Sequence, residues 1–530
     1  MIRSRSSIVR YSLRFSFLDA RSREKSTLSV SDVKLEETLG SEWKDAKPYE
    51  LIPGPKPLPL FGNLTRFLPV IGEYYNLTPT ELVAELRQEY GDIVKLEGLP
   101  GRRRCVFLFN PNDCEKVYRT EGPWPGRVSM ETLRVYRERR NDFYKGEYGL
   151  VASQGQEWHQ FRTKVNQHLM QPRTIRPHIA PLNQVASDFM DKIRTLRDPL
   201  TLEMPVYFNN ETNKWSLESM CVIAFDHRMG CLESNLTSDS EAQIFIDSVR
   251  DLFELTYKLE FLPSLWKLYD TRNLKKLFKV FDRLNGITTK YVNQAKERLA
   301  NKSSTDLGDS SMLERLISVD EHTTTIMIMD MLTAGVDTTS NTVCATMYYI
   351  ASNPEAQEKL LKEAAKVLPS KTSPVTLETL NNIPYLKAVI KESMRLMPIG
   401  LGNLRTTTAN IVVGGYRIPK DNDVIMCHSV MSREPKYFPD ESKFIPERWL
   451  KESSASFHSA KKAHPFAYMP FGFGPRSCIG KRFAYLEMET LLIKLLRNFR
   501  LEWHHGPLKI KSGFINTVET PLRVKMIDNN

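Results

Sequence analysis

The chain has 530 residues, 41% of them hydrophobic and 26% charged, which is the balance of a globular protein with material for a large core. No run of eighteen apolar residues occurs, so we expect no transmembrane helix. The net charge is +11, but nearly half of this surplus lies in the first 25 residues. The remaining body carries an ordinary charge that does not indicate nucleic-acid binding.

Residues 1–47 have the composition of a presequence followed by a polar linker. Arg and Ser are frequent in the first 25 residues, and no acidic residue lies among the first 18. One face of a helix wound from this segment would carry Ile8, Tyr11, Phe15 and Leu18, with arginines on a separate face. Such Arg-rich, acid-poor amphipathic segments are typical of mitochondrial import, whereas a secretory signal needs a continuous apolar stretch. We therefore expect a mitochondrial presequence, with a disordered basic tail as the alternative.

The cysteines indicate a reducing compartment. The seven of them are scattered without paired spacing, which argues against a disulfide framework, and no zinc-binding motif accompanies them.

The remaining residues, 48–530, read as one mostly helical catalytic domain with minor sheet. A rigid proline-rich bend at 52–57 opens this domain. Strands are expected at 93–96, at 105–109, between 405 and 430 with Gly414-Gly415 as a turn, and in the tail from 499 to 527. Helices are expected over most of 155–300, from Glu321 to Ser352, and from Gly480 onward. Loops are expected at 302–311 and 452–462.

An apolar run, Phe261 to Trp266, precedes several lysines. We interpret it, by a narrow margin, as a segment that dips into a membrane surface. A helix turn that faces the core is the alternative.

The segment from Phe471 to Gly480 carries the clearest chemical signal. Cys478 stands at the start of a helix, where free N–H groups and the helix dipole stabilise a thiolate. Gly474 permits a tight turn that aims backbone amides at the sulfur, and such bonds tune an attached iron. Arg476 can pair with a haem propionate. Phe471 would shield the sulfur from water, and Gly480 would let the helix approach the macrocycle.

These five positions match Phe-x-x-Gly-x-Arg-x-Cys-x-Gly, so the segment resembles the haem-binding signature of the cytochrome P-450 superfamily. The resemblance implies the mostly α cytochrome P-450 fold, with a long central helix over the haem and the cysteine loop beneath it. It also implies that Cys478 is the axial ligand of the iron of haem b. An inert buried cysteine is the alternative for this residue alone.

Further motifs follow in the order that the family has them. Glu392-Ser393-Met394-Arg395 supplies the family's Glu-x-x-Arg pair on one helix face, and Pro446-Glu447-Arg448 supplies a third member. The resemblance makes Glu392, Arg395 and Arg448 a structural triad beneath the haem.

A second chemical site is expected inside the long helix, at Ala334-Gly335-Val336-Asp337-Thr338. Gly335 would thin the helix beside a diatomic ligand. The Thr338 hydroxyl can compete for a backbone carbonyl and distort the helix locally. Reduction of dioxygen consumes protons, so a hydroxyl and a nearby acid are needed. The resemblance assigns the relay to Thr338 and the acid to Asp337, which favours a monooxygenase.

Two further arginines are expected at the haem. Trp158 and Arg162 match the family's Trp-x-x-x-Arg and would share a helix face that reaches a propionate, and Arg405 occupies the place of another propionate partner. A core Trp with surface arginines is the alternative.

A basic pair, Lys387 and Lys391, lies one turn apart on the Glu392 helix, and Arg482 could extend it. It matches a pair with which mitochondrial members dock an acidic 2Fe–2S ferredoxin. A solvated lysine face is the alternative.

The resemblance covers about residues 50–527. It implies a haem-thiolate monooxygenase, an oxidoreductase that inserts one atom of O2 into a lipophilic substrate, with electrons from NADPH through ferredoxin reductase and ferredoxin. We expect it on the matrix face of the inner mitochondrial membrane. The sequence is most similar to the insect branch, whose members hydroxylate ecdysteroids or clear lipophilic foreign compounds, and we favour the latter. An electron-independent haem-thiolate isomerase or dehydratase and a non-catalytic haem sensor or carrier are the rival hypotheses.

Overall fold

The structure of the protein, a computed structural model, describes residues 40–59, 61–234, 236–301, 312–451 and 459–529. Residues 47–530 form one compact unit, and residues 1–46 are a unit of their own. The expected loops fall largely outside the described residues, and so does the expected presequence apart from its last few positions.

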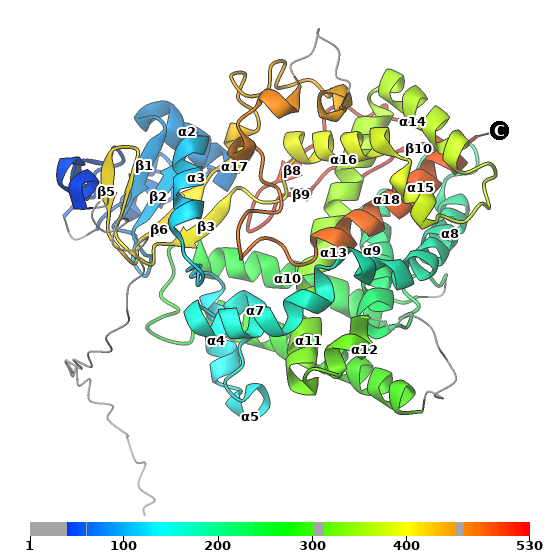
Figure 1. Cartoon of the computed structure of the whole chain (residues 1–530), viewed down its shortest axis with the longest axis horizontal. Coiled ribbons are helices and arrows are strands. Elements are labelled where there is room, and N and C mark those ends of the chain that lie inside the picture. Colours follow the sequence, from blue (N-terminus) through cyan, green and yellow to red (C-terminus); the bar gives the residue numbers. More distant parts are fainter. Residues whose placement is uncertain (1–39, 60, 235, 302–311, 452–458, 530) are drawn as a thin grey trace, which may run out of the picture. The chain divides into compact units, whose positions relative to one another are not determined.

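Helices dominate the compact unit, as expected (Figure 1). The α-helices in the first half are α2 (Pro79–Tyr90), α3 (Pro111–Thr120), α4 (Glu131–Glu138), α5 (Asn141–Tyr144), α6 (Gly149–Ala152), α7 (Gly155–Leu169), α8 (Ile179–Leu196), α9 (Phe208–Phe225), α10 (Glu241–Glu260) and α11 (Arg272–Ala300). Those in the second half are α12 (Met312–Ile317), α13 (Glu321–Ala351), α14 (Pro354–Val367), α15 (Leu377–Asn381), α16 (Pro384–Leu396), α17 (His428–Met431) and α18 (Lys481–Asn498). Short 3-10 turns are η1 (Tyr49–Leu51), η2 (Leu64–Phe67), η3 (Pro172–His178), η4 (Pro446–Trp449), η5 (Ala460–Lys462) and η6 (Pro465–Ala467).

The strands form one four-stranded sheet and three two-stranded ribbons. The sheet has the order β1-β2-β6-β3, and only its β2–β6 pairing is parallel. The ribbons pair β4 with β5 across the predicted glycine turn, β8 with β9, and β10 with β7. The strands are β1 (Ile93–Leu96), β2 (Cys105–Leu108), β3 (Asn403–Thr406), β4 (Ile411–Val413), β5 (Tyr416–Ile418), β6 (Asp423–Met426), β7 (Phe499–Glu502), β8 (Ile510–Lys511), β9 (Thr517–Val518) and β10 (Lys525–Asp528). All the predicted strand regions are confirmed.

Both faces of the four-stranded sheet are covered, because successive side chains of a strand point to opposite faces. Val106 and Leu108 pack with α3 in one apolar cluster, whereas Phe107 packs with α2 in another. In Figure 1 this sheet lies at one end of the compact unit and most of the helices fill the other.

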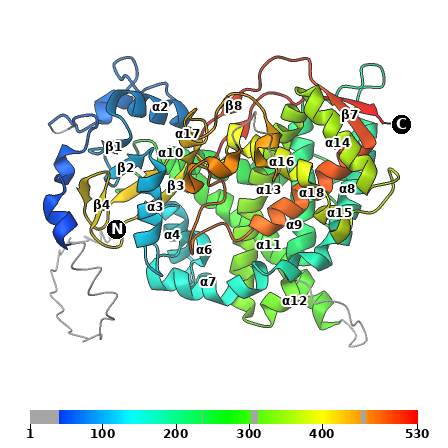
Figure 2. The same cartoon turned by 45° about the horizontal axis from the view of Figure 1, so that its top comes forward.

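The long helix α13 begins and ends as the sequence predicted, to within one residue. Asp320 caps it by accepting hydrogen bonds from the backbone N–H groups of His322 and Thr323, at 3.3 and 3.1 Å. Most of its residues are buried on every side, since α9, α10, α11, α16 and α18 all contact it. It therefore runs through the helical core (Figure 2).

Candidate haem site

Cys478 lies in the loop between η6 and α18, two residues ahead of the helix. Its backbone N–H donates to the Phe471 carbonyl at 2.9 Å, and Gly474 has a φ of +74°, the tight turn that the sequence predicted. The N–H groups of Gly480 and Lys481 point to the sulfur and favour the thiolate. Burial outweighs them and raises the pKa of the thiol, although the side chain is exposed. The residue lines a cavity of about 530 Å³, so its exposed surface faces that cavity.

A group of buried arginines surrounds this region. Arg476 lies over the Trp158 ring, 4.3 Å from its centre, and donates to the carbonyls of Pro125 and Ser153 at 2.8 and 3.0 Å. Its Nη1 atom and the Nε atom of Arg127 have no hydrogen-bond partner among the residues that the structure describes. Burial, and then the neighbouring positive charges of Arg127 and others, lowers the pKa of Arg476 to about 8.

Such a surplus of buried positive charge fits an anionic partner. Burial lowers the pKa of both Arg127 and Arg162 to about 10, and the charge of Cys478 opposes that shift in each. A buried guanidinium without a counter-charge is costly, so the cluster suits a group with two carboxylates close to a thiolate. Haem, which carries two propionates, has this charge pattern.

The other predicted haem contacts are buried as well, with partners of their own. Arg162 donates from Nη2 to the Ser477 carbonyl at 3.1 Å, so α7 holds the cysteine loop directly. Arg405 forms a buried ion pair with Glu121 and donates to the Phe473 carbonyl at 3.0 Å. A side chain on Gly474 would collide with the same Glu121 carboxylate, at 2.5 Å. Arg405 thus contacts the cysteine loop while Glu121 balances its positive charge.

The structure brings the Glu392, Arg395 and Arg448 triad together with every described polar group paired. Arg395 donates twice to Glu392, at 2.8 and 2.9 Å, and Arg448 donates to it at 3.0 Å. Trp449 adds a fourth bond to the carboxylate at 2.8 Å. The two guanidinium groups also donate to backbone carbonyls of the segment 432–443, so the triad fixes that segment against α16.

One stripe of α13 is accessible within the buried helix. Ala334 is exposed and Thr338, one turn on, is partly exposed. The Thr338 hydroxyl donates to the Ala334 carbonyl at 2.9 Å, which is the predicted bond to the backbone, but α13 is helical throughout, so the predicted distortion is not seen. The prediction for Gly335 is wrong in its reason. A side chain there would meet Met220 of α9 at 3.0 Å, so this glycine lets two helices approach and does not make room for a ligand.

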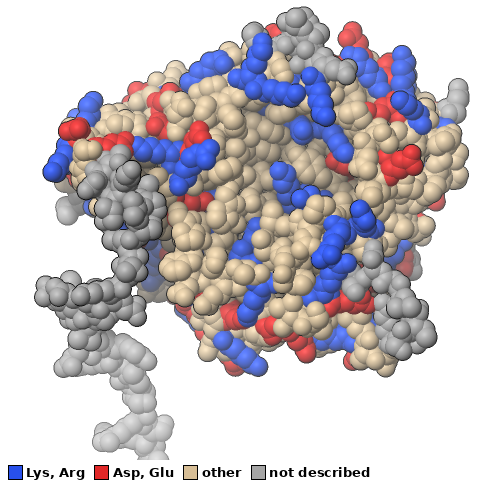
Figure 3. Space-filling view, in the orientation of Figure 1, with Lys and Arg blue, Asp and Glu red and all other residues tan. Residues whose placement is uncertain are grey.

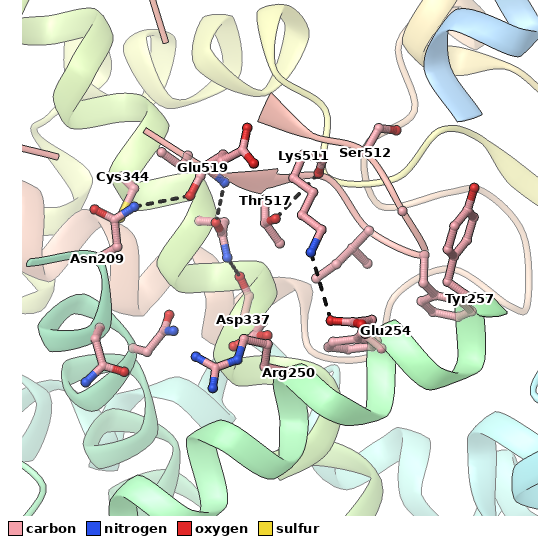
Figure 4. Close-up of a pocket in the computed structure, with 18 of the residues that line it drawn as sticks. Asn209, Arg250, Glu254, Tyr257, Asp337, Cys344, Lys511, Ser512, Thr517 and Glu519 are labelled. Carbon is pink, nitrogen blue, oxygen red and sulfur yellow. Dashed lines mark hydrogen bonds and ion pairs between the residues drawn. The ribbon is translucent and has the colours of Figure 1, made fainter. Parts of the chain in front are cut away.

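The Asp337 side chain lines a different cavity from the one that Ala334 lines. It lines a cavity of about 560 Å³ together with Arg250 of α10, as Figure 4 shows, whereas Ala334 lines a separate cavity of about 220 Å³. Its Oδ1 atom has no hydrogen-bond partner. Burial raises the pKa of this carboxyl to about 7, and the charge of Arg250 opposes the shift. An acid of this kind can be protonated near neutral pH.

Basic side chains lie close to the cysteine loop on the outer side. Lys387, Lys481 and Arg482 line a cavity of about 530 Å³ that Cys478 also lines. Lys391 is half-buried beside the Trp449 ring, and burial lowers its pKa. Figure 3 shows Lys and Arg side chains gathered near the middle of one face, where acidic ones are few.

Exposed apolar side chains form what we call the apolar edge, made of the 261–269 segment and the neighbouring segment 58–71. Leu265 is 48% exposed and Val70 is 99% exposed, but Trp266 is buried, so the predicted apolar run divides between surface and core. The turn between β1 and β2 joins the two segments, because Arg102 donates to the Leu259 carbonyl at 2.6 Å and Gly98 accepts from the Asn63 N–H at 3.0 Å. Within the described ranges, no helix has the length and apolar character needed to cross a membrane.

Two residues of the site were missed in the sequence. In the sequence, Arg127 belongs to the stretch 120–150 that we expect in the wall of the substrate cavity, and only the fold shows that it lies near the other arginines. Lys481 adjoins the cysteine signature, and its position at the start of an expected helix could have marked it as exposed.

Comparisons with known proteins identify the family of the chain. The family model of cytochrome P-450 matches residues 52–526. The chain is 41% identical over 500 residues to a protein of Drosophila melanogaster named probable cytochrome P-450 12a5, mitochondrial, covering 92% of each chain. It is 38% identical over 524 residues to cytochrome P-450 CYP12A2 of Musca domestica, covering 96% of this chain and 95% of that one.

A third relative, named probable cytochrome P-450 301a1, mitochondrial, from Drosophila melanogaster, is 39% identical over 490 residues and covers 92% and 88% of the two chains. The chain therefore belongs to the cytochrome P-450 family of haem-thiolate monooxygenases, and the predicted family and fold class are confirmed.

Proposed function

We propose that this protein is a mitochondrial monooxygenase that inserts one oxygen atom of O2 into a lipophilic substrate and receives its electrons from NADPH through a ferredoxin reductase and a 2Fe–2S ferredoxin. One observation carries the proposal. Cys478 lines a cavity beside a helix N-terminus, and buried arginines with unpaired N–H groups surround it.

In this proposal Cys478 holds the iron of haem b, and Arg476, Arg127, Arg162 and Trp158 hold its propionate side. Arg405 contributes through the cysteine loop, since its own charge is matched by Glu121. Phe471 and Gly480 flank the sulfur, and the thiolate donates electron density that favours cleavage of the O–O bond. The haem supplies the activation of dioxygen.

Asp337 and Thr338 are proposed to supply protons. Asp337 takes up a proton in the larger cavity and holds it near neutral pH because its carboxyl is buried. Thr338 presents a hydroxyl on the accessible stripe of α13 next to Ala334. The two residues are neighbours on α13, and a bound water that links the Asp337 carboxyl to the Thr338 hydroxyl would carry the proton between them.

The basic residues beside Cys478 are proposed to dock the ferredoxin. Lys387, Lys481 and Arg482 surround the cavity that leads to the sulfur, which brings an acidic electron donor close to the iron ligand. The half-buried Lys391 contributes less directly, through its charge behind Lys387.

The apolar edge is proposed to rest on a membrane surface, and we place the protein on the matrix face of the inner mitochondrial membrane. Exposed apolar side chains from two segments next to each other are typical of a monotopic contact. The mitochondrial placement draws on the names of the relatives and on the expected presequence.

The substrate class follows from the smaller cavity. Leu133, Leu252, Phe281 and Leu284 line most of one wall, and Arg127, Arg137 and Asn285 are among the polar residues that also line it, which suits a lipophilic molecule with a few polar groups. We favour foreign compounds over ecdysteroids.

The test is turnover of the haem-loaded protein with NADPH, ferredoxin reductase and ferredoxin under labelled dioxygen. We expect substrate-dependent NADPH oxidation and one labelled oxygen atom in each product. Product formed without NADPH or ferredoxin would point to an isomerase or dehydratase, and a spectral response to ligands without any turnover would point to a sensor.

A further inference from the structure

Two cavities meet at a pair of phenylalanines. The outer cavity, of about 560 Å³, lies between α9, α10, α13 and the β8–β9 hairpin, and includes the exposed residues Val206 and Tyr207 (Figure 4). The inner cavity, of about 220 Å³, is lined by Ala334, by apolar residues and by a polar margin that includes Arg127, Arg137 and Asn285. Phe253 and Phe514 line both cavities, so they lie between the two spaces.

These two rings are stacked against each other. Their centres are 5.6 Å apart and their planes differ by 18°. Phe253 belongs to α10, whereas Phe514 belongs to the loop that joins β8 to β9. A third ring, Phe261, meets Phe514 edge-on at 5.6 Å but lines neither cavity.

An ion pair lies beside the stack. Glu254 follows Phe253 on α10, and Lys511 lies three residues before Phe514. Their charged atoms are 4.0 Å apart, and both side chains are well exposed, at 44% and 64%. Such a long, solvated pair adds little stability, and Lys258 competes for the same carboxylate at 2.5 Å. Figure 4 shows Lys511 and Glu254 facing each other across the outer cavity.

The base of the hairpin is held more firmly than its tip. The Val518 N–H donates to Asn341 of α13 at 2.7 Å, and the Asn516 side chain donates to the Pro398 carbonyl at 2.8 Å. On the tip, Ser512 shares a hydrogen bond with Thr80 at 2.9 Å. Gly513, which precedes Phe514, leaves the backbone there free to adjust. Movement of Phe514 therefore requires loss of its stack on Phe253 and its edge contact with Phe261, and movement of the whole tip also breaks the Ser512–Thr80 hydrogen bond and the weak ion pair.

We propose that Phe253 and Phe514 form a door between the inner and outer cavities, that the Glu254–Lys511 pair is its latch, and that ring-sized ligands of the iron pass through it. The proposal rests on the proposed function only in placing the haem beside the inner cavity. It makes the outer cavity a passage for ligands as well as the space that Asp337 faces.

The test measures exchange of two probes on the ferric haem protein in detergent, by stopped-flow absorbance. 4-Phenylimidazole is large enough to need the open door, and imidazole is small. Phe253→Ala and Phe514→Ala should each raise both the association and the dissociation rate of 4-phenylimidazole about three- to tenfold, the worth of one aromatic pair, with an unchanged Kd. Imidazole exchange should change less than about twofold, because a small ligand needs little of that stack to be lost.

Matched variants decide whether the door itself is responsible. Phe261→Ala loses a ring contact with Phe514 that does not lie between the two cavities, and should raise the exchange rates of 4-phenylimidazole less than Phe253→Ala does. Lys511→Gln should accelerate the exchange of 4-phenylimidazole about twofold. Lys509→Gln, a substitution of an exposed lysine that lines neither cavity, should leave that rate unchanged.

Three results would overturn the proposal. They are unchanged rates in both phenylalanine variants, a change in Kd that comes from dissociation alone, and an equal acceleration in Phe261→Ala. These measurements need only haem binding, so an absence of monooxygenase turnover would refute the proposed function and leave the door to be judged separately.

Discussion

The two sides of the proposed haem site are built differently. On the cysteine side, Glu392, Arg395 and Arg448 are buried, with short bonds to one another and to the backbone. On the side of α13, Asp337 has an oxygen without a hydrogen-bond partner among the described residues, two cavities meet at a ring stack, and the Glu254–Lys511 pair beside that stack is long and exposed. Buried ion pairs fix the segment that the triad holds, whereas the cavities and the unpaired carboxyl oxygen leave the α13 side able to exchange protons and ligands.

The largest effect is expected when one arginine of the buried triad on the cysteine side is removed. Arg395→Ala leaves Glu392 with one guanidinium partner in a buried position, and we expect a loss of about 3–5 kcal/mol of stability. Thermal unfolding followed by the haem absorbance measures it.

The control is Arg119→Ala on α3, which removes an exposed pair with Glu115 (2.6 Å) and should cost less than about 1 kcal/mol. Equal losses in the two variants would mean that the triad is no more than a surface-type interaction.

On the adjustable side, Asp337→Asn should lower turnover about a hundredfold, the usual worth of a positioned acid. Because burial raises the pKa of Asp337 to about 7, the wild-type rate should fall as pH rises above that value, and this descending limb should be absent in the variant.

Asp337→Asn should lower turnover but raise the free energy of unfolding above neutral pH. The folded-state pKa exceeds the ordinary 3.8, so ionisation of Asp337 weakens the fold as pH rises from about 4 to 7, and the variant should be the more stable protein above pH 7. A retained descending limb, or a less stable variant, would contradict this role.

Substitutions in the apolar edge test whether this surface contacts a membrane. Leu265→Asp and Val70→Asp should each weaken binding to vesicles of mitochondrial lipid composition about tenfold, since each removes exposed apolar area that the membrane would bury. Leu200→Asp, at a 92% exposed leucine in the turn after α8, is the matched control and should bind normally. Loss of binding in the control alone would place the membrane contact elsewhere.

The smallest effect is expected from substitutions in the basic surface that is proposed to dock the ferredoxin. Lys387→Gln and Lys481→Gln should each raise the KM for ferredoxin about two- to fivefold with little change in kcat, because each exposed charge pair is weak. The difference should shrink as salt is added. Lys461→Gln on η5, which does not line the cavity at Cys478, should match the wild type. A fall in kcat with an unchanged KM would argue against docking.

The same contrast explains what the sequence could predict. The cysteine signature, the triad and the limits of α13 were predictable because each depends on residue types at fixed local spacing. The roles of Arg127 and Met220 were not, since Arg127 meets the other arginines only through the fold and Met220 meets Gly335 only through helix packing. Nor could spacing show that Asp337 lines a different cavity from Ala334, three residues before it on the same helix.

The most direct test of the central claim is the absorption spectrum of the reduced, haem-loaded protein with carbon monoxide. Ligation by the Cys478 thiolate predicts the red-shifted band of thiolate-bound haem in the wild type and its loss in Cys478→Ala. A histidine-type band in the folded wild type, or a thiolate-type band that persists in Cys478→Ala, would contradict the account.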